Sequence, residues 1–398
     1  MFGWEFPPYN SGGLGTACEG LVKALAGENV RLILVLPKRL GQATPHAKLL
    51  FADVDKLVRV KAIATGLYPY ILSGPGADQT GGGPPGLYGA DLLGEVWAYA
   101  ARARELVVGE DFDLIHAHDW LAFPAGVAVK ALTGKPLVLH VHATEFDRTG
   151  GNGVNEEVYR IEKECLSLAD RVIAVSRWTK DTLLKHYALP PEKIEVVHNG
   201  VDTDAFRPLA PTLTALKKAG AKIVLFVGRI TLQKGPDYFI KAAKRVLEFE
   251  PDTYFVMAGS GDMLGASMNL AAATGVADRF LFPGFIRGEE LNQVYQAADL
   301  FVLSSVSEPF GLTPLEALAN GTPVLVSKQS GVAEVLEHAL KVDFWDIDEM
   351  ANKIVAALRH EPLLTALRQN GGWEIKKLSW PAAAKKCLNV YRSLLPAS

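Results

Sequence analysis

Two glutamates stand eight positions apart in the stretch SEPFGLTPLEALANGTPVL, residues 307–325. Glu308 precedes a proline, and a residue in that position avoids the α region, so its carboxylate is expected on extended backbone. Gly311 then allows the backbone to turn closely around a ligand. Glu316 follows inside the next expected helix. The spacing therefore places two carboxylates on either side of a tight turn.

The helix after this turn is expected to begin with a capping box. Thr313 is a good N-cap residue, Pro314 suits the first helical position, and Glu316 lies three residues after Thr313. The Asn-Gly pair at 320–321 provides the stop. A helix that begins at the carboxyl end of a parallel strand offers N–H groups to an anion. The simpler alternative is that Glu316 only closes the capping box and Glu308 is a solvated loop acid.

Two basic residues follow another apolar run, in the stretch FVGRITLQKG at 226–235. Arg229 offers a planar fork of donors and Lys234 a compact point charge. Such groups suit a leaving diphosphate, whose negative charge grows in the transition state. On their own, two basic loop residues are also compatible with a solvated surface.

A glycine-rich turn, NSGGLGTACEGLVKAL at 10–25, is expected to open a helix near the N-terminus. Such turns serve many nucleotide-binding folds, so this signal alone is weak. The spacing around Gly12 and Gly13 is not the G-x-G-x-x-G fingerprint of dinucleotide-binding proteins. A nicotinamide-dependent oxidoreductase therefore lacks its main sequence signal.

Histidines alternate in two further stretches, HAHDW from His116 and HVHATEF from His140. Alternate residues of a strand share a face, so His116 with His118, or His140 with His142, could chelate a metal. A metal-dependent hydrolase is the contrasting hypothesis. The sequence offers no obvious further ligand set beyond two nearby acids, and histidines in a doubly wound fold also face packed helices.

Short apolar runs alternate with segments of helical period along the whole chain. Runs that are apolar on both faces favour a parallel sheet covered by helices. The pattern restarts after the turn-rich stretch at 200–208, which predicts α/β architecture with two tandem doubly wound Rossmann-like domains facing a cleft. The expected strands lie at 31–36, 113–118, 136–142, 171–176 and 193–199, and then at 222–228, 252–259, 279–284, 299–305 and 323–327.

Two segments depart from this regular pattern. Residues 73–86 have the glycine and proline content of a mobile loop. Only Met1 to Phe6 precede the glycine-rich region, which leaves little room for the strand that should feed it. We expect either a shortened first strand or a clipped N-terminus.

Composition narrows the classes of partner. A net charge of −3 gives no general attraction to nucleic acid. No apolar run approaches the roughly 20 residues of a membrane span, and no signal segment is recognisable, so we expect a cytoplasmic protein. The three cysteines lack metal-type spacing and are expected to be buried hydrophobic residues.

The segment from Glu308 to Glu316, with FG and PLEA between, resembles the signature of retaining glycosyltransferases of family 4 type, which have the glycosyltransferase B fold. The stretches FVGRITLQKG, NSGGLG and HAHDW are similar to the phosphate clamp, the glycine loop and the acceptor region of the glycogen and starch synthases in this group. The resemblance covers nearly the whole chain. It implies domains at 1–203 and 204–379, with a final helix at 380–398 returning to the first domain.

The resemblance also implies roles at the donor sugar. Glu308 would hold sugar hydroxyl groups, and Glu316 would hold the ribose of the nucleotide. Backbone groups of Gly311, Leu312 and Thr313 would face sugar and phosphate. Carboxylates accept hydrogen bonds from hydroxyl groups but repel a diphosphate, so they should flank the anion.

Further roles are carried over in the same way. Arg229 and Lys234 would hold the diphosphate, and the loop at Gly12 and Gly13 would close over it. The turn at 285–286 would bind the base through Phe285 and Ile286.

In the first domain, Asp119 and His142 would contact acceptor and sugar, whereas His116, His118 and His140 are expected to be structural. Glycogen synthases that use ADP-glucose generally carry a lysine where this chain has Asn10, so the nucleotide of the donor stays open.

The function implied is transfer of a glucosyl-type hexose from ADP-glucose or UDP-glucose to a hydroxyl acceptor, with retention of configuration. No Asp-x-Asp motif stands out at a strand end, so neither a metal nor another cofactor is expected. Residues 1–205 contain 20 Lys and Arg against 25 Asp and Glu, which disfavours docking on an anionic membrane. A glycogen-like α-glucan is the expected acceptor. The alternatives are a small soluble or lipid-linked acceptor and a retaining phosphorylase.

Overall fold

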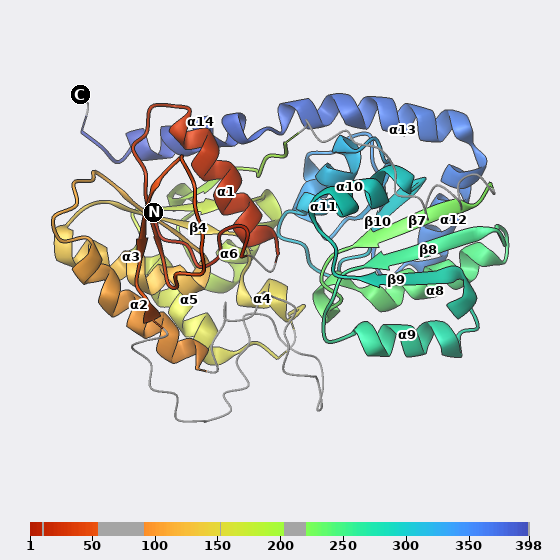
Figure 1. The fold of residues 1–398 in the computed structure, drawn as a ribbon, viewed down its shortest axis with the longest axis horizontal. Coiled ribbons are helices and arrows are strands. Elements are labelled where there is room, and N and C mark those ends of the chain that lie inside the picture. The colour runs from red at the N-terminus through yellow and green to blue at the C-terminus, as the bar shows by residue number, and fades with distance from the viewer. Residues whose placement is uncertain (10–11, 55–90, 152, 203–219, 397–398) are drawn as a thin grey trace. The chain divides into compact units, whose positions relative to one another are not determined.

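The structure is a computed structural model that describes residues 1–9, 12–54, 91–151, 153–202 and 220–396. The expected loop at 73–86, Asn10 and most of the expected hinge at 200–208 lie outside the described residues. The chain divides into two compact units. The first contains the described residues up to Gly200 and those from Trp380 onward, and the second contains Val201–Ser379. Figure 1 shows the order of the elements along the chain.

The first unit is built on parallel strands. Four of them pair in the order β3-β4-β5-β6, and β1 pairs with β2. Phe2 forms parallel bridges to both Val35 in β1 and Ala117 in β3, so the N-terminal residues join the two groups of strands. A very short extended segment therefore occupies the first-strand position. The strands are β1 (Ile33–Leu36), β2 (Lys48–Phe51), β3 (Ile115–His118), β4 (Leu137–Val141), β5 (Arg171–Ala174) and β6 (Ile194–Val196).

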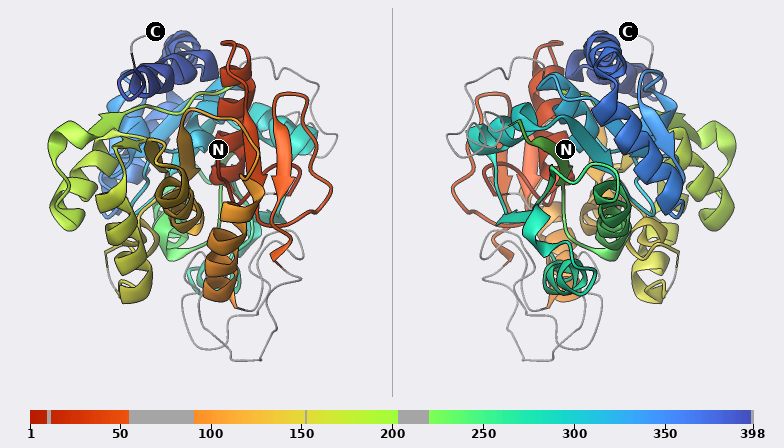
Figure 2. Two further views of the ribbon diagram at one scale, coloured as in Figure 1. Left: turned by 90° about the vertical axis from the view of Figure 1, so that its left-hand side faces the viewer. Right: turned by 90° about the vertical axis from the view of Figure 1, so that its right-hand side faces the viewer.

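Helices cover this sheet on both faces (Figure 2). The two faces differ, because Ala117 and Leu139 join the large hydrophobic cluster formed with α2, α3 and α5, while the alternate residue His116 contacts Tyr391 of α14. The helices are α1 (Gly13–Ala26), α2 (Leu92–Leu106), α3 (Asp119–Thr133), α4 (Glu145–Arg148), α5 (Glu156–Leu168), α6 (Arg177–Tyr187), the 3₁₀ turn η2 (Pro191–Lys193) and α14 (Trp380–Arg392).

The second unit contains one six-stranded parallel sheet in the order β12-β11-β10-β7-β8-β9. Its strands are β7 (Lys222–Val227), β8 (Thr253–Ala258), β9 (Phe280–Gly284), β10 (Leu300–Leu303), β11 (Val324–Ser327) and β12 (Leu340–Val342). Its helices are α8 (Pro236–Leu247), α9 (Leu264–Ala273), α10 (Gly288–Ala297), α11 (Leu312–Ala319), α12 (Ile347–Arg359) and α13 (Glu361–Glu374), with 3₁₀ turns η3 (Leu232–Lys234), η4 (Ala277–Arg279), η5 (Gly331–Glu334) and η6 (Ile375–Lys377).

The predicted fold class is confirmed, because each of the ten expected apolar runs contains a strand and both sheets are parallel. Two strands were missed, β2 and β12. Both lie at the edge of their group of strands, and most of their residues are only partly buried. A half-covered edge strand does not produce the continuous apolar run that marks a strand in the middle of a sheet.

The contact between α1 and α14 gives a test of the first unit. A Cβ added at Gly20 of α1 would lie 2.2 Å from ring atom Cε2 of Trp380. Gly20→Ala is therefore expected to lower the free energy of unfolding by about 1–3 kcal/mol, as overpacking does, when measured by urea denaturation. The matched control is Gly265→Ala in α9, where an added Cβ meets no described atom within 4 Å. The control is expected to be neutral or stabilising, and equal effects of the two changes would contradict the packing of α14 on α1.

Candidate functional site

Glu308 lies in the loop after β10, on extended backbone as the following proline predicts. It forms a parallel bridge with Ser330, with its N–H donating to the Gln329 carbonyl at 2.9 Å and its own carbonyl accepting from Gly331 N–H at 2.9 Å. The residue as a whole is 6% exposed. The Ser305 hydroxyl lies 3.3 Å from Glu308 Oε2 and donates to it. The carboxylate is thus fixed both by its backbone and by a neighbouring hydroxyl.

Lys234 approaches the same carboxylate from the loop after β7. Its Nζ forms an ion pair with Glu308 Oε2, and the two side chains are 16% and 8% exposed. Lys234 is the last residue of η3, and Gly235 follows with φ of +60°. A Cβ at Gly235 would lie 2.3 Å from the Ser304 carbonyl oxygen, so only glycine permits this approach of the two loops. Two residues expected in one site are therefore in direct contact.

Arg229 lies on the same loop as Lys234. One of its guanidinium nitrogens donates to Gln233 Oε1 at 3.3 Å. The loop follows the central strand β7, which pairs with β10, the strand that precedes Glu308. Because the carboxyl ends of parallel strands meet at one edge of a sheet, both basic residues and Glu308 belong to that edge of the second unit.

The expected capping box at Thr313 is wrong. The N-cap of α11 is Gly311, with φ of +103°, and the helix begins at Leu312, so Thr313 lies inside the first turn. The left-handed conformation of Gly311 lets the chain enter the helix two residues earlier than a Thr313 cap would allow. Within the described ranges no side chain caps this N-terminus, so its first N–H groups are available to a ligand or solvent. The expected stop is present, with Asn320 as C-cap and Gly321 at φ of +80°.

Glu316 contacts a residue that the sequence did not indicate. The Tyr295 hydroxyl of α10 donates to Glu316 Oε2 at 2.9 Å, and the Tyr295 side chain is fully buried. Burial raises the pKa of Glu316, and this hydrogen bond opposes the rise. Tyr295 therefore holds the carboxylate that the capping-box interpretation had assigned to the helix N-terminus. In the sequence, the only feature that could have indicated this partner was a tyrosine within an amphipathic helical segment.

The remaining predicted residues of the second unit follow β9. Phe285 is 46% exposed, whereas Ile286 is buried. The Arg287 guanidinium lies over the Phe285 ring, 4.8 Å from its centroid. An exposed ring next to a buried anchor can present an aromatic face to a flat ligand.

In the first unit, the expected helix after the glycines is α1. Gly12 is its N-cap on extended backbone, and Gly13 is its first residue. Neither glycine has a side chain that would keep a ligand away from the backbone N–H groups at this helix end.

Asp119 and His142 come together at the ends of β3 and β4. Asp119 has φ of +58° and begins α3. Its Oδ1 accepts from the N–H of His142 at 2.6 Å and of Ala143 at 3.3 Å. Burial raises the pKa of Asp119 to about 7. Asp119 therefore positions the backbone that carries His142, a role that its residue type and sequence place did not predict.

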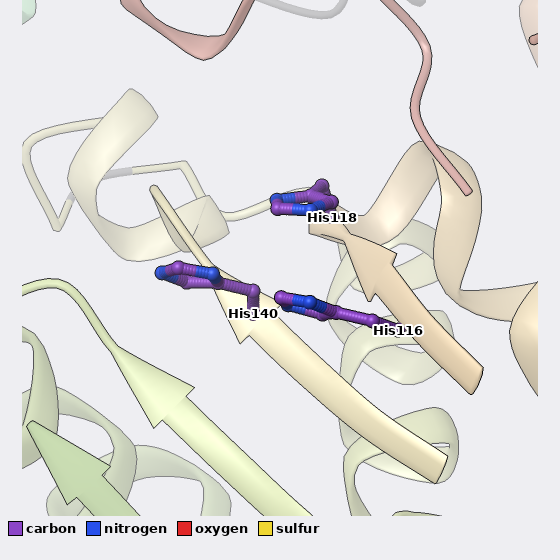
Figure 3. A group of neighbouring side chains, drawn as sticks. All are labelled: His116, His118 and His140. Carbon is purple, nitrogen blue, oxygen red and sulfur yellow. The ribbon is translucent and has the colours of Figure 1, made fainter. Parts of the chain in front are cut away.

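The other three histidines line one face of the sheet beside His142. His116, His118 and His140 are all buried, and Figure 3 shows their rings next to one another. The His118 and His142 rings are joined by a contact of 2.9 Å between Nδ1 and Nε2. Burial lowers the pKa of each of the three buried histidines well below 6.5, so they are neutral at pH 7. No described carboxylate joins them in a candidate ligand set, so this group does not favour the hydrolase hypothesis.

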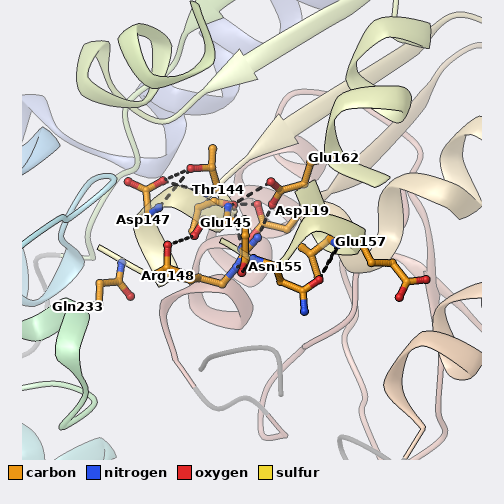
Figure 4. A network of polar contacts seen from close by, with 12 residues as sticks. Asp119, Thr144, Glu145, Asp147, Arg148, Asn155, Glu157, Glu162 and Gln233 are labelled. Carbon is orange, nitrogen blue, oxygen red and sulfur yellow. Dashed lines mark hydrogen bonds and ion pairs between the residues drawn. The ribbon is translucent and has the colours of Figure 1, made fainter. Parts of the chain in front are cut away.

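A buried ionic network supports the segment after His142 (Figure 4). Arg148 pairs with Glu145, with 3.1 Å between Nε and Oε2, and with Glu162 of α5. Its Nη1 also donates to the Ala143 carbonyl at 3.0 Å. Burial opposes the charge on Arg148, but the carboxylates of Glu162 and Glu145 raise its pKa above the ordinary value. Removing one partner of such a buried group typically costs about 3–5 kcal/mol. The network stabilises the loop that carries His142, and it could not be predicted from the sequence.

Two family models match the chain. The description "Glycosyl transferases group 1" matches residues 214–372, and "Glycosyltransferase Family 4" matches residues 11–205. An uncharacterized glycosyltransferase of Methanocaldococcus jannaschii is 30% identical, covering 98% of this chain and 97% of that protein. A D-inositol 3-phosphate glycosyltransferase of Segniliparus rotundus is 33% identical, covering 78% of this chain and 73% of that protein.

Solved structures show the same architecture. Sucrose-phosphate synthase from Thermosynechococcus elongatus superposes with a TM-score of 0.80 at 23% identity, covering 100% of this chain and 98% of that one. Anabaena HepE in complex with UDP and glucose superposes with a TM-score of 0.71 at 19% identity, covering 97% of this chain and 98% of that one. The fold and the family matches thus define a glycosyltransferase of the B fold. The chain belongs to the family with group 1 and family 4 glycosyltransferase domains.

The buried histidines predict a pH dependence of stability. Because their folded-state pKa values lie below 6.5, the unfolded chain binds more protons in acid, and the stability present above about pH 6.5 is lost as the pH falls. Asp119 and Glu162, whose pKa values burial raises to about 7, oppose this trend. His140→Phe removes one histidine, so the slope of unfolding free energy against pH should fall by about 1.4 kcal/mol per pH unit between pH 6 and 4.5.

Urea unfolding at several pH values measures this slope. The control is His46→Phe, because His46 is exposed. Parallel curves for the His140 variant and the unchanged protein would show that His140 is not buried and neutral as described.

Proposed function

We propose that this protein transfers a hexosyl group, glucosyl in the first instance, from a nucleoside diphosphate sugar to an acceptor hydroxyl with retention of configuration. The observation that carries the proposal is the contact between Lys234 and Glu308 at the carboxyl edge of the second sheet. The contact joins a carboxylate, which can accept hydrogen bonds from sugar hydroxyl groups, to a cation that suits phosphate. The UDP and glucose found with Anabaena HepE support the same donor chemistry for this chain.

The proposed donor contacts are those that the family resemblance implies, and the grouping of these residues in the second unit supports them. Glu308 holds hydroxyl groups of the sugar, Glu316 holds the ribose, and Arg229 with Lys234 holds the diphosphate. Because the Lys234 ammonium neutralises Glu308, the carboxylate can lie beside a diphosphate without net repulsion. The N–H groups of Leu312 and Thr313, at the start of α11, supply further donors, with Gly311 allowing close approach.

The other predicted residues are proposed to contact the base and the sugar and to cover the phosphate of the donor. Phe285 and Ile286 face the base, and the backbone at Gly12 and Gly13 covers the phosphate and sugar. His142 contacts the donor sugar. Asp119 acts by holding the His142 backbone.

The proposed reaction breaks the bond between the anomeric carbon and the diphosphate oxygen. The acceptor oxygen forms its bond to the same face of that carbon, and the departing phosphate takes the acceptor proton. Arg229, Lys234 and the helix N-terminus stabilise the developing negative charge, as preorganised donors do. Because these cations are supplied by the chain, we propose that the reaction needs no divalent ion.

For the acceptor, we propose a small soluble polyol or sugar, free or phosphorylated. The printed names of similar proteins, D-inositol 3-phosphate glycosyltransferase and sucrose-phosphate synthase, support this class. The α-glucan expected from the sequence is the second candidate, supported by the resemblance of HAHDW to glycogen synthases. A lipid-linked acceptor is disfavoured by the acidic balance of residues 1–205. None of the helices in the described ranges is long and apolar enough to cross a membrane, and a cytoplasmic location stays a prediction.

Donor turnover tests the proposal directly. The protein is incubated in EDTA with UDP-glucose or ADP-glucose and with inositol phosphate, fructose 6-phosphate, glucose 6-phosphate or glycogen, and released nucleoside diphosphate is measured. Release that depends on one acceptor names donor and acceptor together. Release of glucose 1-phosphate from a glucan with inorganic phosphate alone would instead identify a phosphorylase. Activity only after Mg²⁺ or Mn²⁺ is added would contradict the metal-free mechanism.

Variants of the ion pair separate chemistry from folding. Lys234→Ala and Glu308→Gln are each expected to lower kcat by about 10²–10³, the cost of losing a charge-stabilising group. Each leaves one buried charge unpaired, so the double variant Lys234→Met/Glu308→Gln is the better folded control and should be equally inactive. Lys328→Ala, in the same unit and paired with Asp343 on the surface, should retain activity. Near-normal turnover in the folded double variant would contradict the site.

Tyr295 gives a test of the ribose contact. Tyr295→Phe leaves Glu316 unsupported, so the KM of the donor should rise about 2–10-fold with a smaller change in kcat, as expected for one lost hydrogen bond. With a donor whose ribose lacks its hydroxyl groups, the change should have little effect. An equal rise in KM for both donors would show that Tyr295 only supports the fold.

A further inference from the structure

Three histidines of the first unit lie on one face of the sheet because of the alternation and register of the strands. His116 and His118 alternate along β3, and His140 is the register partner of His118 in the neighbouring strand β4. Figure 3 shows the three imidazoles side by side above these strands. One ring nitrogen from each histidine can be chosen so that all three lie within 4.8 Å of one another. The fold thus brings three nitrogen ligands to one place.

Four ring nitrogens of these histidines have no hydrogen-bond partner among the described residues. They are Nε2 of His116, Nε2 of His118 and both ring nitrogens of His140. The three side chains are 3%, 0% and 2% exposed. Leaving buried polar atoms unpaired is costly, and native proteins usually satisfy them. A single ligand that takes one lone pair from each ring accounts for three of these four atoms.

The opposite nitrogens of two of these rings are occupied. Nδ1 of His116 lies 2.6 Å from the Tyr391 hydroxyl of α14, and Nδ1 of His118 lies 2.9 Å from His142 Nε2. If each Nδ1 carries the proton, each Nε2 presents a lone pair toward the cluster. Metal-binding histidines use this arrangement, in which the second ring nitrogen is held by an outer hydrogen bond.

We propose that His116, His118 and His140 bind one transition-metal ion of the Zn²⁺ class, at a structural site that is separate from the donor site. Imidazole nitrogens suit Zn²⁺, Cu²⁺, Ni²⁺ and Co²⁺, whereas Mg²⁺ and Ca²⁺ prefer oxygen ligands. A water molecule takes the fourth position.

Binding requires rotation of the rings, because His116 and His140 are stacked with their planes 8° apart. The His116 and His118 rings are stacked at 4.4 Å between centroids with their planes 29° apart, so their lone pairs do not converge on one point. Nitrogen ligands of a tetrahedral Zn²⁺ lie about 3.3 Å apart, which follows from bond lengths of about 2.0–2.1 Å. In the proposed site the rings turn about their Cβ–Cγ bonds so that one nitrogen of each approaches the ion. The ion then ties β3 to β4, and through Tyr391 to α14.

The experiment measures metal content and affinity, with no use of activity. The full-length protein is purified, loaded with Zn²⁺, dialysed against buffer without metal and analysed by plasma mass spectrometry. One ion per chain is expected. Co²⁺ in place of Zn²⁺ should give the visible absorption of a four-coordinate site with nitrogen ligands.

Variants locate the ion. His140→Phe and, separately, His118→Gln should abolish retention of the metal, whereas Tyr391→Phe, which removes only an outer hydrogen bond, should weaken Zn²⁺ binding about 10–100-fold. His46→Phe removes an exposed histidine and should change nothing. Circular dichroism confirms folding of each variant.

Two outcomes overturn the proposal. One is absence of retained Zn²⁺, Co²⁺, Ni²⁺ and Cu²⁺ in the unchanged protein, with ordered water on the histidines in a crystal structure. The other is metal retention that neither His140→Phe nor His118→Gln reduces. Neither result bears on the proposed transfer reaction, which is tested in EDTA through other residues.

Discussion

The buried ion pair between Lys234 and Glu308 is the constraint on which the candidate site depends. The carboxylate of a residue that is 6% exposed is costly to bury without a partner, and the lysine supplies that partner from a loop 74 residues earlier in the chain. Gly235 is required for the approach, because a side chain there would collide with the Ser304 carbonyl. The contact therefore holds two loops together before any ligand binds. It also combines in one place the charge pattern that a nucleoside diphosphate sugar requires.

The first unit uses buried charge in a different way. Arg148 is surrounded by Glu145 and Glu162, and Asp119 holds the backbone N–H groups of His142 and Ala143. All of these contacts stabilise the segment that follows β4, and none of them leaves a charged group facing solvent. The polar groups of the segment are thus satisfied by one another, which favours a single arrangement. A single placement of His142 is what a sugar contact in the proposed reaction needs.

Much of the fold could be predicted from the sequence, because strands in the middle of a parallel sheet are apolar on both faces. The proline after Glu308 correctly predicted extended backbone at that residue. The Asn-Gly pair correctly predicted the end of α11. The predicted start of α11 was wrong. A glycine in the left-handed region can begin a helix as well as a threonine cap can, and sequence spacing does not distinguish the two. Partners distant in the chain could not be predicted. Tyr295 with Glu316, and Arg148 with Glu162, meet only because strands and helices pack, and their residue types are equally compatible with a solvated surface.

The most direct test of the donor site is a calorimetric titration of the protein with UDP-glucose and ADP-glucose in EDTA, repeated with the folded Lys234→Met/Glu308→Gln variant. A site built on this ion pair predicts that one of the donors binds the unchanged protein with a stoichiometry of one, and that the variant binds it far more weakly. Equal binding by the two proteins, or binding that appears only when a divalent ion is added, would contradict it.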